Sequence, residues 1–137
     1  MANTIRPESL QKQLGSILDE YEAEVKEVVK DTLPKVGKET VKELKKTSPK
    51  DRGRYLKTWK SKIEEDRMGQ KLIVYNKDHY MLTHLLEHGH ALVGGGRTEP
   101  REHIKPAQDN AVENVIKEVK RRLVEWSYLI LEMNLKA

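Results

Sequence analysis

The stretch HLLEHGH, which begins at His84, contains the pattern H-x-x-E-H. On a helix, histidines at positions i and i+4 lie on one face and can both bind zinc, while the glutamate between them acts as a base toward a metal-bound water. His84 and His88 have this spacing, and Glu87 has the place of the base. His90 and His103 are candidates for a third ligand. A small zinc-dependent hydrolase is therefore one hypothesis that the sequence raises.

Features of the same stretch favour the alternative, that these histidines are surface and packing residues. The helix that would carry them is about two turns long and ends at Gly89. The third-ligand candidates lie in or beside a glycine-rich loop, whereas a catalytic ligand needs rigid support. The chain also has no cysteine, no P-loop pattern and no serine in a nucleophile elbow. We therefore predict no catalytic residue, no metal and no other cofactor.

The composition is that of a polar domain with mixed charge. Of 137 residues, 36% are hydrophobic and 35% charged, and 26 basic residues against 22 acidic ones give a net charge of +4. The signs are interleaved, unlike the basic face of a dedicated nucleic-acid binder, although a pI near 9.2 keeps a basic nucleic-acid-binding protein as an alternative. With no signal peptide and no apolar run of about 20 residues, we expect a protein made in the cytoplasm without membrane contact.

The first third of the chain predicts a long helix. From Leu10 to Leu44 apolar residues recur at steps of three and four, which places them on one stripe. Pro34 and Gly37 are expected to kink or break this helix into pieces over about 6–33 and 35–46. The first piece alone would be about 40 Å long. Either it lies across a sheet, or a neighbouring subunit covers part of it, and the sequence leaves both open.

The rest of the chain predicts an α+β fold. A turn-rich segment follows residue 46, and residues 55–76 alternate as a β hairpin around DRMGQ. We expect a short helix over 79–89, a loop over 90–105 and a C-terminal helix over 106–130. One domain, residues 1–137, then comprises a helical segment over 1–46 kinked near Pro34 and the C-terminal helix, both packed on a small antiparallel sheet, with a long glycine-rich loop.

Two segments carry a resemblance to a known family. SPKDRGRYLKTWK (48–60) is similar to a Ser-Pro-x-Asp-Thr-Gly pattern, although Arg52 stands where Thr or Ser is commoner. LTHLLEHGHALVGGGRTEPREHIKPA (82–107) is similar to a Leu-Glu-x-Gly-His stretch, a glycine-rich loop and Pro-x-x-His-Ile-x-Pro-Ala before a final helix. In this order and spacing, they resemble the tail-completion or head–tail joining proteins of long-tailed bacteriophages.

The resemblance implies a structural virion protein without enzymatic activity, acting in the neck between the head and the tail. Such a protein would form a homo-oligomeric ring, hexameric or dodecameric, around the DNA channel. It would contact the connector, the tail terminator or the tail tube, and the DNA without sequence specificity. His84 and His88 occupy variable places in the family pattern, whereas Glu87, Gly89, His90, His103, Ile104, Pro106 and Ala107 match it.

We therefore expect an interaction loop with anchored ends. Gly89 would leave the short helix with φ > 0, and Pro106 would begin the last helix. His90 and His103 are expected to hydrogen-bond across the base of the loop, with Glu87 as an acceptor. Arg97, Arg101 and Lys105 would face DNA phosphates or acidic neighbours, unless solvent alone surrounds them. The predicted loop and its anchors comprise Glu87, Gly89, His90, Gly94, Gly95, Gly96, Arg97, Arg101, His103, Ile104 and Pro106.

Overall fold

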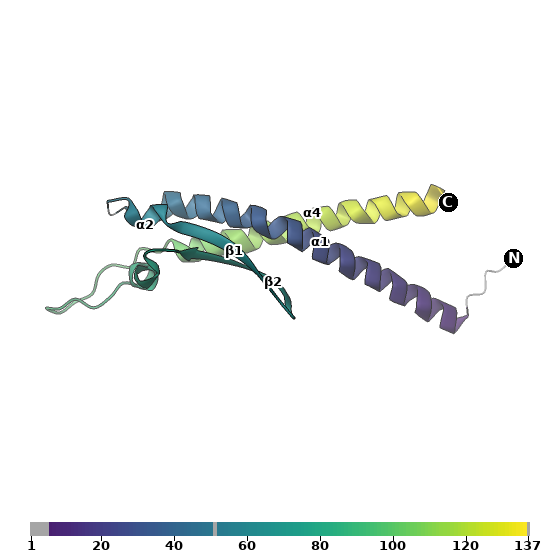
Figure 1. Ribbon diagram of the computed structural model, residues 1–137, viewed down its shortest axis with the longest axis horizontal. Coiled ribbons are helices and arrows are strands. Elements are labelled where there is room, and N and C mark those ends of the chain that lie inside the picture. Colours follow the sequence, from purple (N-terminus) through teal and green to yellow (C-terminus); the bar gives the residue numbers. More distant parts are fainter. Residues whose placement is uncertain (1–5, 51, 137) are drawn as a thin grey trace.

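The computed structural model describes residues 6–50 and 52–136, with side chains up to Met133. The fold is α+β: two long helices and a two-stranded antiparallel sheet (Figure 1). The long helices are antiparallel, because Glu43 lies beside Asn110 and Asp31 beside Arg122. The elements are α1 (Pro7–Thr47), α2 (Arg54–Lys57), β1 (Trp59–Asp66), β2 (Gly69–Asn76), the 3-10 turn η1 (Tyr80–Leu82), α3 (Thr83–His88) and α4 (Ile104–Lys136).

Helix α1 runs without a break through Pro34. The predicted division into two helices is therefore wrong, although the helix axis does change direction in its middle part (Figure 1). Pro34 has no N–H to donate to the carbonyl of Lys30, and a proline at this position costs about 3 kcal/mol. Buried residues on both sides of it, among them Val28, Leu33 and Val36, hold the helix together across that defect.

Gly37 does not break α1 either, because it lies where the hairpin approaches the helix most closely. A Cβ at this position would be 2.8 Å from Leu72 Cδ1 and 3.0 Å from Ser61 Oγ. Leu72 belongs to β2 and Ser61 to β1, so the missing side chain admits both strands. The glycine that was expected to end a helix instead sets the distance between helix and sheet.

Substituting Gly37 by valine is expected to lower the free energy of unfolding by about 2 kcal/mol, since overpacking a closed contact costs about 1–3 kcal/mol. Urea denaturation would measure the change. Gly15→Val is the matched control: it lies in the same helix, and a Cβ there would meet no atom within 4 Å. Equal losses at Gly37 and Gly15 would contradict this account.

The hairpin pairs Trp59 with Asn76 at its open end and Asp66 with Gly69 at the turn. It begins later than residue 55, where the sequence predicted it. Residues 54–57 form the helical turn α2. Gly53, which precedes it, has the left-handed conformation with a φ of 73°. The period-two alternation that predicts a strand starts only at Trp59, so the tyrosine and leucine before it were assigned to the wrong element.

The buried core lies near the C-terminal end of α1. Leu44, Tyr55, Trp59 and Ala107 form its centre. The indole N–H of Trp59 donates a 2.9 Å hydrogen bond to Ser48 Oγ. Thus α1, α2, β1 and α4 meet at a single cluster, which holds the start of α4 in place. Helix α4 extends beyond the predicted range at both ends, beginning at Ile104 and continuing to Lys136.

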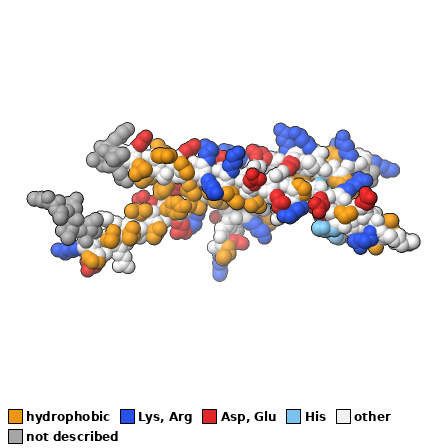
Figure 2. Space-filling model, turned by 180° about the vertical axis from the view of Figure 1, so that it is seen from behind, with side chains coloured by type: hydrophobic (Ala, Val, Ile, Leu, Met, Phe, Trp, Pro, Cys, Tyr) orange, Lys and Arg blue, Asp and Glu red, His pale blue; other side chains and the backbone are white. Residues whose placement is uncertain are grey.

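The opposite ends of the two long helices extend beyond this core and diverge (Figure 1). The Tyr21 and Trp126 rings still touch, with centroids 6.0 Å apart. Beyond them, hydrophobic side chains on both helices face solvent, as the space-filling view shows (Figure 2). These exposed side chains include Leu10, Leu14, Ile17 and Leu18 of α1, and Tyr128, Leu129, Leu131 and Met133 of α4.

Among the helices that the structure describes, none combines the length and the hydrophobicity that a membrane span requires.

Candidate interaction loop and its anchors

The carboxylate of Glu87 caps the start of α4. Its Oε2 accepts the backbone N–H groups of His103 at 2.8 Å and Ile104 at 2.9 Å, and its Oε1 accepts that of Lys105 at 2.8 Å. The first N–H groups of a helix have no partner within the helix, so an acceptor from another element satisfies them. The negative charge also lies at the positive end of the helix dipole. Glu87 thereby ties α3 to α4 across the intervening loop.

The environment of Glu87 favours its ionised form. Burial raises the pKa of this carboxyl, but the three backbone N–H donors and the nearby His103 together outweigh burial and lower the pKa below its ordinary value. Glu87 is therefore a carboxylate at neutral pH. It accepts hydrogen bonds and does not serve as a proton donor.

His103 is a second buried side chain at the base of the loop. Its Nδ1 lies 2.7 Å from the carbonyl oxygen of Arg101, which can only accept, so Nδ1 carries a proton. Nδ1 also lies 3.1 Å from Glu87 Oε2. In the neutral ring, Nε2 is then the acceptor, and Tyr55 Oη lies 2.7 Å from it. The imidazole thus connects the start of α4 to α2.

Tyr55 is the hydrogen-bond donor in this pair. Burial and the negative charge of Glu87 raise the pKa of Tyr55 to about 12, so its hydroxyl stays protonated. The rings of Tyr55, Trp59 and His103 pack edge to face, with centroids between 5.5 and 6.2 Å apart. The backbone carbonyl of Tyr55 accepts a 2.8 Å hydrogen bond from Asn76 Nδ2. The segments 48–60 and 82–107, which carry the resemblance, meet here.

Substituting Tyr55 by phenylalanine is expected to cost about 1–2 kcal/mol of unfolding free energy, because it removes the donor from a buried imidazole nitrogen without opening a cavity. Thermal and urea denaturation would measure the loss. Tyr80→Phe removes the same group from an exposed ring and should leave stability within about 0.5 kcal/mol. A Tyr55→Phe protein as stable as the parent would show that the Tyr55–His103 bond contributes nothing.

Gly89 ends α3 in a conformation that L side chains rarely adopt. Its φ is 74° and its ψ is 168°. A Cβ at this position would also collide with the carbonyl oxygen of Thr98 and come within 3.4 Å of Pro100 N. The two sides of the loop's base therefore touch at this residue, and both the backbone angle and the space require glycine.

The loop itself is a short finger. Its two sides are joined by backbone hydrogen bonds from Thr98 N to His90 O (2.9 Å) and from Leu92 N to Gly96 O (3.0 Å). Between these bonds, Ala91 and Arg97 form an antiparallel β-bridge. Gly95 and Gly96, with φ of 99° and 84°, form the reversal, whereas Gly94 keeps an ordinary φ. Arg101 N donates to Leu86 O at 2.8 Å and closes the base. The finger projects from the body at the end opposite the chain termini (Figure 1), with Val93 fully exposed.

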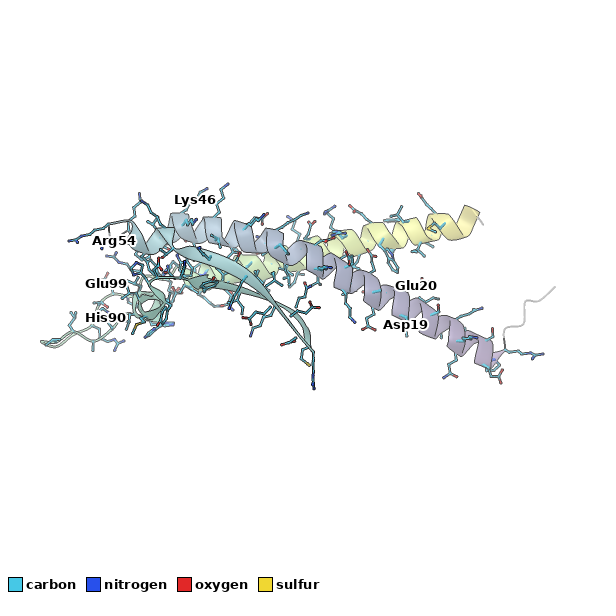
Figure 3. All side chains as sticks on the ribbon, viewed as in Figure 1. Asp19, Glu20, Lys46, Arg54, His90 and Glu99 are labelled. Carbon is cyan, nitrogen blue, oxygen red and sulfur yellow. The ribbon has the colours of Figure 1, made fainter. Side chains whose placement is uncertain are left out.

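His90 and His103 both form hydrogen bonds at the base of the loop, each with a different partner and not with each other. His90 stays exposed, and its Nδ1 lies 3.1 Å from Thr98 Oγ1, whereas His103 is buried against Tyr55. Figure 3 labels His90 and Glu99 near the base of the finger. The sequence did not identify Thr98 and Tyr55 as partners. Tyr55 lies in the first resembling segment, which is the only signal that pointed toward it.

The geometry of α3 is unsuitable for the zinc hydrolase. His84 and His88 are exposed, whereas the Glu87 carboxylate is buried and bonded to the backbone of α4. The residue that would activate a metal-bound water is therefore turned away from the two histidines. Among the residues that the structure describes, no three His, Cys, Asp or Glu side chains are grouped to hold a metal ion.

The basic residues near the loop differ in their surroundings. Arg97 Nη2 donates a 3.3 Å hydrogen bond to Gly89 O, and Lys105 forms a 2.6 Å ion pair with Asp109. Arg101 is exposed. Ile104 begins α4 and packs against the core, while Pro106 lies two residues further into the first turn, where its missing N–H costs nothing.

The Glu87–His103 network caps α4 and fixes the base of a projecting finger, so these side chains have a structural use. The chain matches the family described as "Bacteriophage HK97-gp10, putative tail-component" over residues 9–89. This match covers more than half of the chain, and the chain belongs to that family. It is a structural component of a bacteriophage tail and hence of the virion. No curated protein and no solved structure matches it significantly.

Proposed function

We propose that the protein acts in head–tail joining or tail completion, as a homo-oligomeric ring at the neck of the virion. The observation that carries this proposal is the uncovered apolar surface on the free ends of α1 and α4, in a chain from a tail-component family. Soluble monomers rarely expose large continuous apolar patches. Closed symmetry would let one such surface be covered repeatedly by identical neighbours.

The finger loop is the proposed contact with other neck or tail proteins, such as the connector, the tail terminator or the tail tube. Its tip presents Leu92 and Val93 to solvent, while Glu87, Gly89 and His103 fix its base. A fixed base lowers the entropy that the loop loses when it binds. The role proposed here needs no catalysis. Arg97 and Arg101 would make non-specific contact with DNA in the channel.

The proposed role is tested by removing the protein from an otherwise normal phage infection. A nonsense mutation in its gene should give DNA-filled heads and separate tails, seen by electron microscopy, with few infectious particles. Adding the purified protein to the lysate should restore joined particles. A mutant that still yields joined, infectious particles would contradict the role. Deleting only the finger tip that carries Leu92 and Val93 should prevent the joining of heads to tails and should leave oligomerisation of the protein intact.

A further inference from the structure

We propose that the N-terminal arm of α1 in one copy, residues 7–24, docks as a helix into a groove between β2 and α4 of the next copy. This inference deepens the proposed function, because it rests on the protein forming a homo-oligomer. It names the two different surfaces that would meet, and so predicts a head-to-tail contact between subunits.

The groove consists of two adjoining hollows: one of about 580 Å³ on the face of α4 alone, and one of about 540 Å³ between α4, β2 and α1. Gln108, Val112 and Ile116 line both. Val112 and Ile116 of α4 are 53% and 49% exposed, although they adjoin the core. The strand side of the groove is lined by Leu72 and Val74 of β2. The floor is therefore apolar and open to solvent.

The rim of the groove is mostly basic. Four lysines line it, Lys71, Lys105, Lys117 and Lys120, against the acidic Asp109 and Glu113. Lys105 is already paired with Asp109. Lys117 and Lys120 lie one turn apart at the end of the groove toward the C-terminus of α4, which gives that end a local positive charge.

The arm has the opposite charge around a matching apolar stripe. Leu10, Leu14, Ile17 and Leu18 are 45–65% exposed and recur at helical spacing, and Tyr21, which touches Trp126 of the same chain, continues the stripe with 46% of its surface exposed. Around them the arm carries Glu8, Asp19, Glu20, Glu22 and Glu24, with Lys12 as its only basic residue. Asp19 and Glu20 lie on the free part of α1 (Figure 3). An acidic amphipathic helix suits an apolar groove with a basic rim.

The dimensions agree, and they exclude docking within one chain. The stripe from Leu10 to Tyr21 is about 17 Å long, and α4 from Lys105 to Lys120 spans about 22 Å. In the same chain Glu43, not Leu14, lies beside Asn110 at the groove. Leu14 is about 40 Å away along the continuous α1. The arm in the groove must therefore come from another copy.

Cysteine cross-linking tests the contact directly, because the chain has no cysteine of its own. The double variant Leu14→Cys/Val112→Cys should form a ladder of disulfide-linked oligomers under mild oxidation. The two single variants should each remain uncross-linked, whereas their mixture should give a dimer containing one of each. Cross-linking of the Leu14→Cys variant alone would mean that arms pair with arms, and would overturn the inference.

Charge reversal gives a second readout that does not depend on oxidation. Lys117→Glu/Lys120→Glu should weaken self-association at least tenfold in sedimentation experiments, and adding Asp19→Lys/Glu20→Lys in the same chain should restore much of it. Lys45→Glu/Lys46→Glu, at the far end of α1 (Lys46 is labelled in Figure 3), is the matched control and should have little effect. If Asp19→Lys/Glu20→Lys fails to restore the self-association that Lys117→Glu/Lys120→Glu weakens, the inference is overturned.

The inference and the proposed function fail in different ways. The protein could form its oligomer while Leu14→Cys/Val112→Cys gives no ladder of disulfide-linked oligomers. In that case the arm does not occupy the groove, and another protein or another face covers both surfaces. The ring at the neck would then stand without this contact. If the protein stays monomeric even with its virion neighbours present, the oligomeric function fails as well.

Discussion

Replacing Glu87 by alanine is expected to lower the free energy of unfolding by about 3 kcal/mol, because three backbone N–H groups at the start of α4 lose their acceptor at once. The hydrogen bond from His103 N is buried and the other two are partly buried, so water replaces the carboxylate poorly at His103. His103 also loses a neighbour that lies 3.1 Å from its Nδ1. Urea denaturation at neutral pH would measure the loss.

The charge of Glu87 adds an acid dependence with a definite sign. Because the folded protein lowers the pKa of this carboxyl, its contribution is present above the ordinary glutamate pKa of about 4.3 and is lost as the pH falls through the lowered value. Glu87→Gln should therefore have a lower free energy of unfolding than the parent protein at pH 7. In acid the difference in unfolding free energy between the two proteins should become smaller. An equal difference at both pH values would contradict the carboxylate's role.

The neighbouring histidines supply the control for both measurements. His84→Ala and His88→Ala alter the other two residues of the H-x-x-E-H pattern, whose side chains are exposed. Each should change stability by less than about 0.5 kcal/mol. If these substitutions destabilise the protein as much as Glu87→Ala, the three residues act together, and the capping account is wrong.

Replacing Gly89 by alanine is expected to cost about 3 kcal/mol as well, for a different reason. A side chain at its φ of 74° and ψ of 168° is strained by about 1–3 kcal/mol, and the added Cβ would press on the carbonyl of Thr98, which is backbone and cannot rotate away. Relief requires the two sides of the loop's base to separate. Denaturation would report the cost, and hydrogen exchange at Thr98 N would report the separation.

Gly94→Ala is the matched substitution in the same loop. Gly94 has an ordinary φ, and an added Cβ would meet no atom within 4 Å. Stability should stay the same or rise slightly, since alanine reduces the entropy of the unfolded chain. If Gly94→Ala lowered the free energy of unfolding as much as Gly89→Ala, any reduction in loop flexibility would be destabilising, and the contact between Gly89 and Thr98 would not explain the loss.

Local periodicity predicted the long helices and the hairpin, but little of the arrangement of residues at the base of the loop. The stripe from Leu10 to Leu44 and the spacing after Pro106 predict α1 and α4, and the alternation from Trp59 predicts the hairpin, because these signals repeat within a few residues. The Glu87–Gly89–His103 set was selected through the family resemblance. Its geometry was not predictable, since Tyr55 and His103 are 48 positions apart.

Tertiary packing explains the errors in the middle of the chain. Pro34 and Gly37 have the local preferences of helix breakers, but apolar packing and the close approach of Leu72 outweigh them. Residues 55–57 were included in the predicted hairpin, whereas Gly53 in its left-handed conformation and the buried Tyr55 make 54–57 a helical turn. At Gly37 and at Tyr55 the partners, Leu72 and His103, are distant in the sequence, so no short window contains them.

The continuity of α1 has a mechanical consequence. A single helix of 41 residues joins the free arm to the segment that packs on the hairpin at Gly37, with no loop between them. A stiff helix transmits a sideways push on its end as a torque at its supported part, and Pro34, where one backbone hydrogen bond is missing, is the softest point between the two. Helix α4 also holds α1 at Asp31 and Tyr21, so a push on the arm is resisted first at these contacts, and only a movement of α1 that breaks them or carries α4 along bends the helix at Pro34, about 5 Å along the axis from the contact with the sheet.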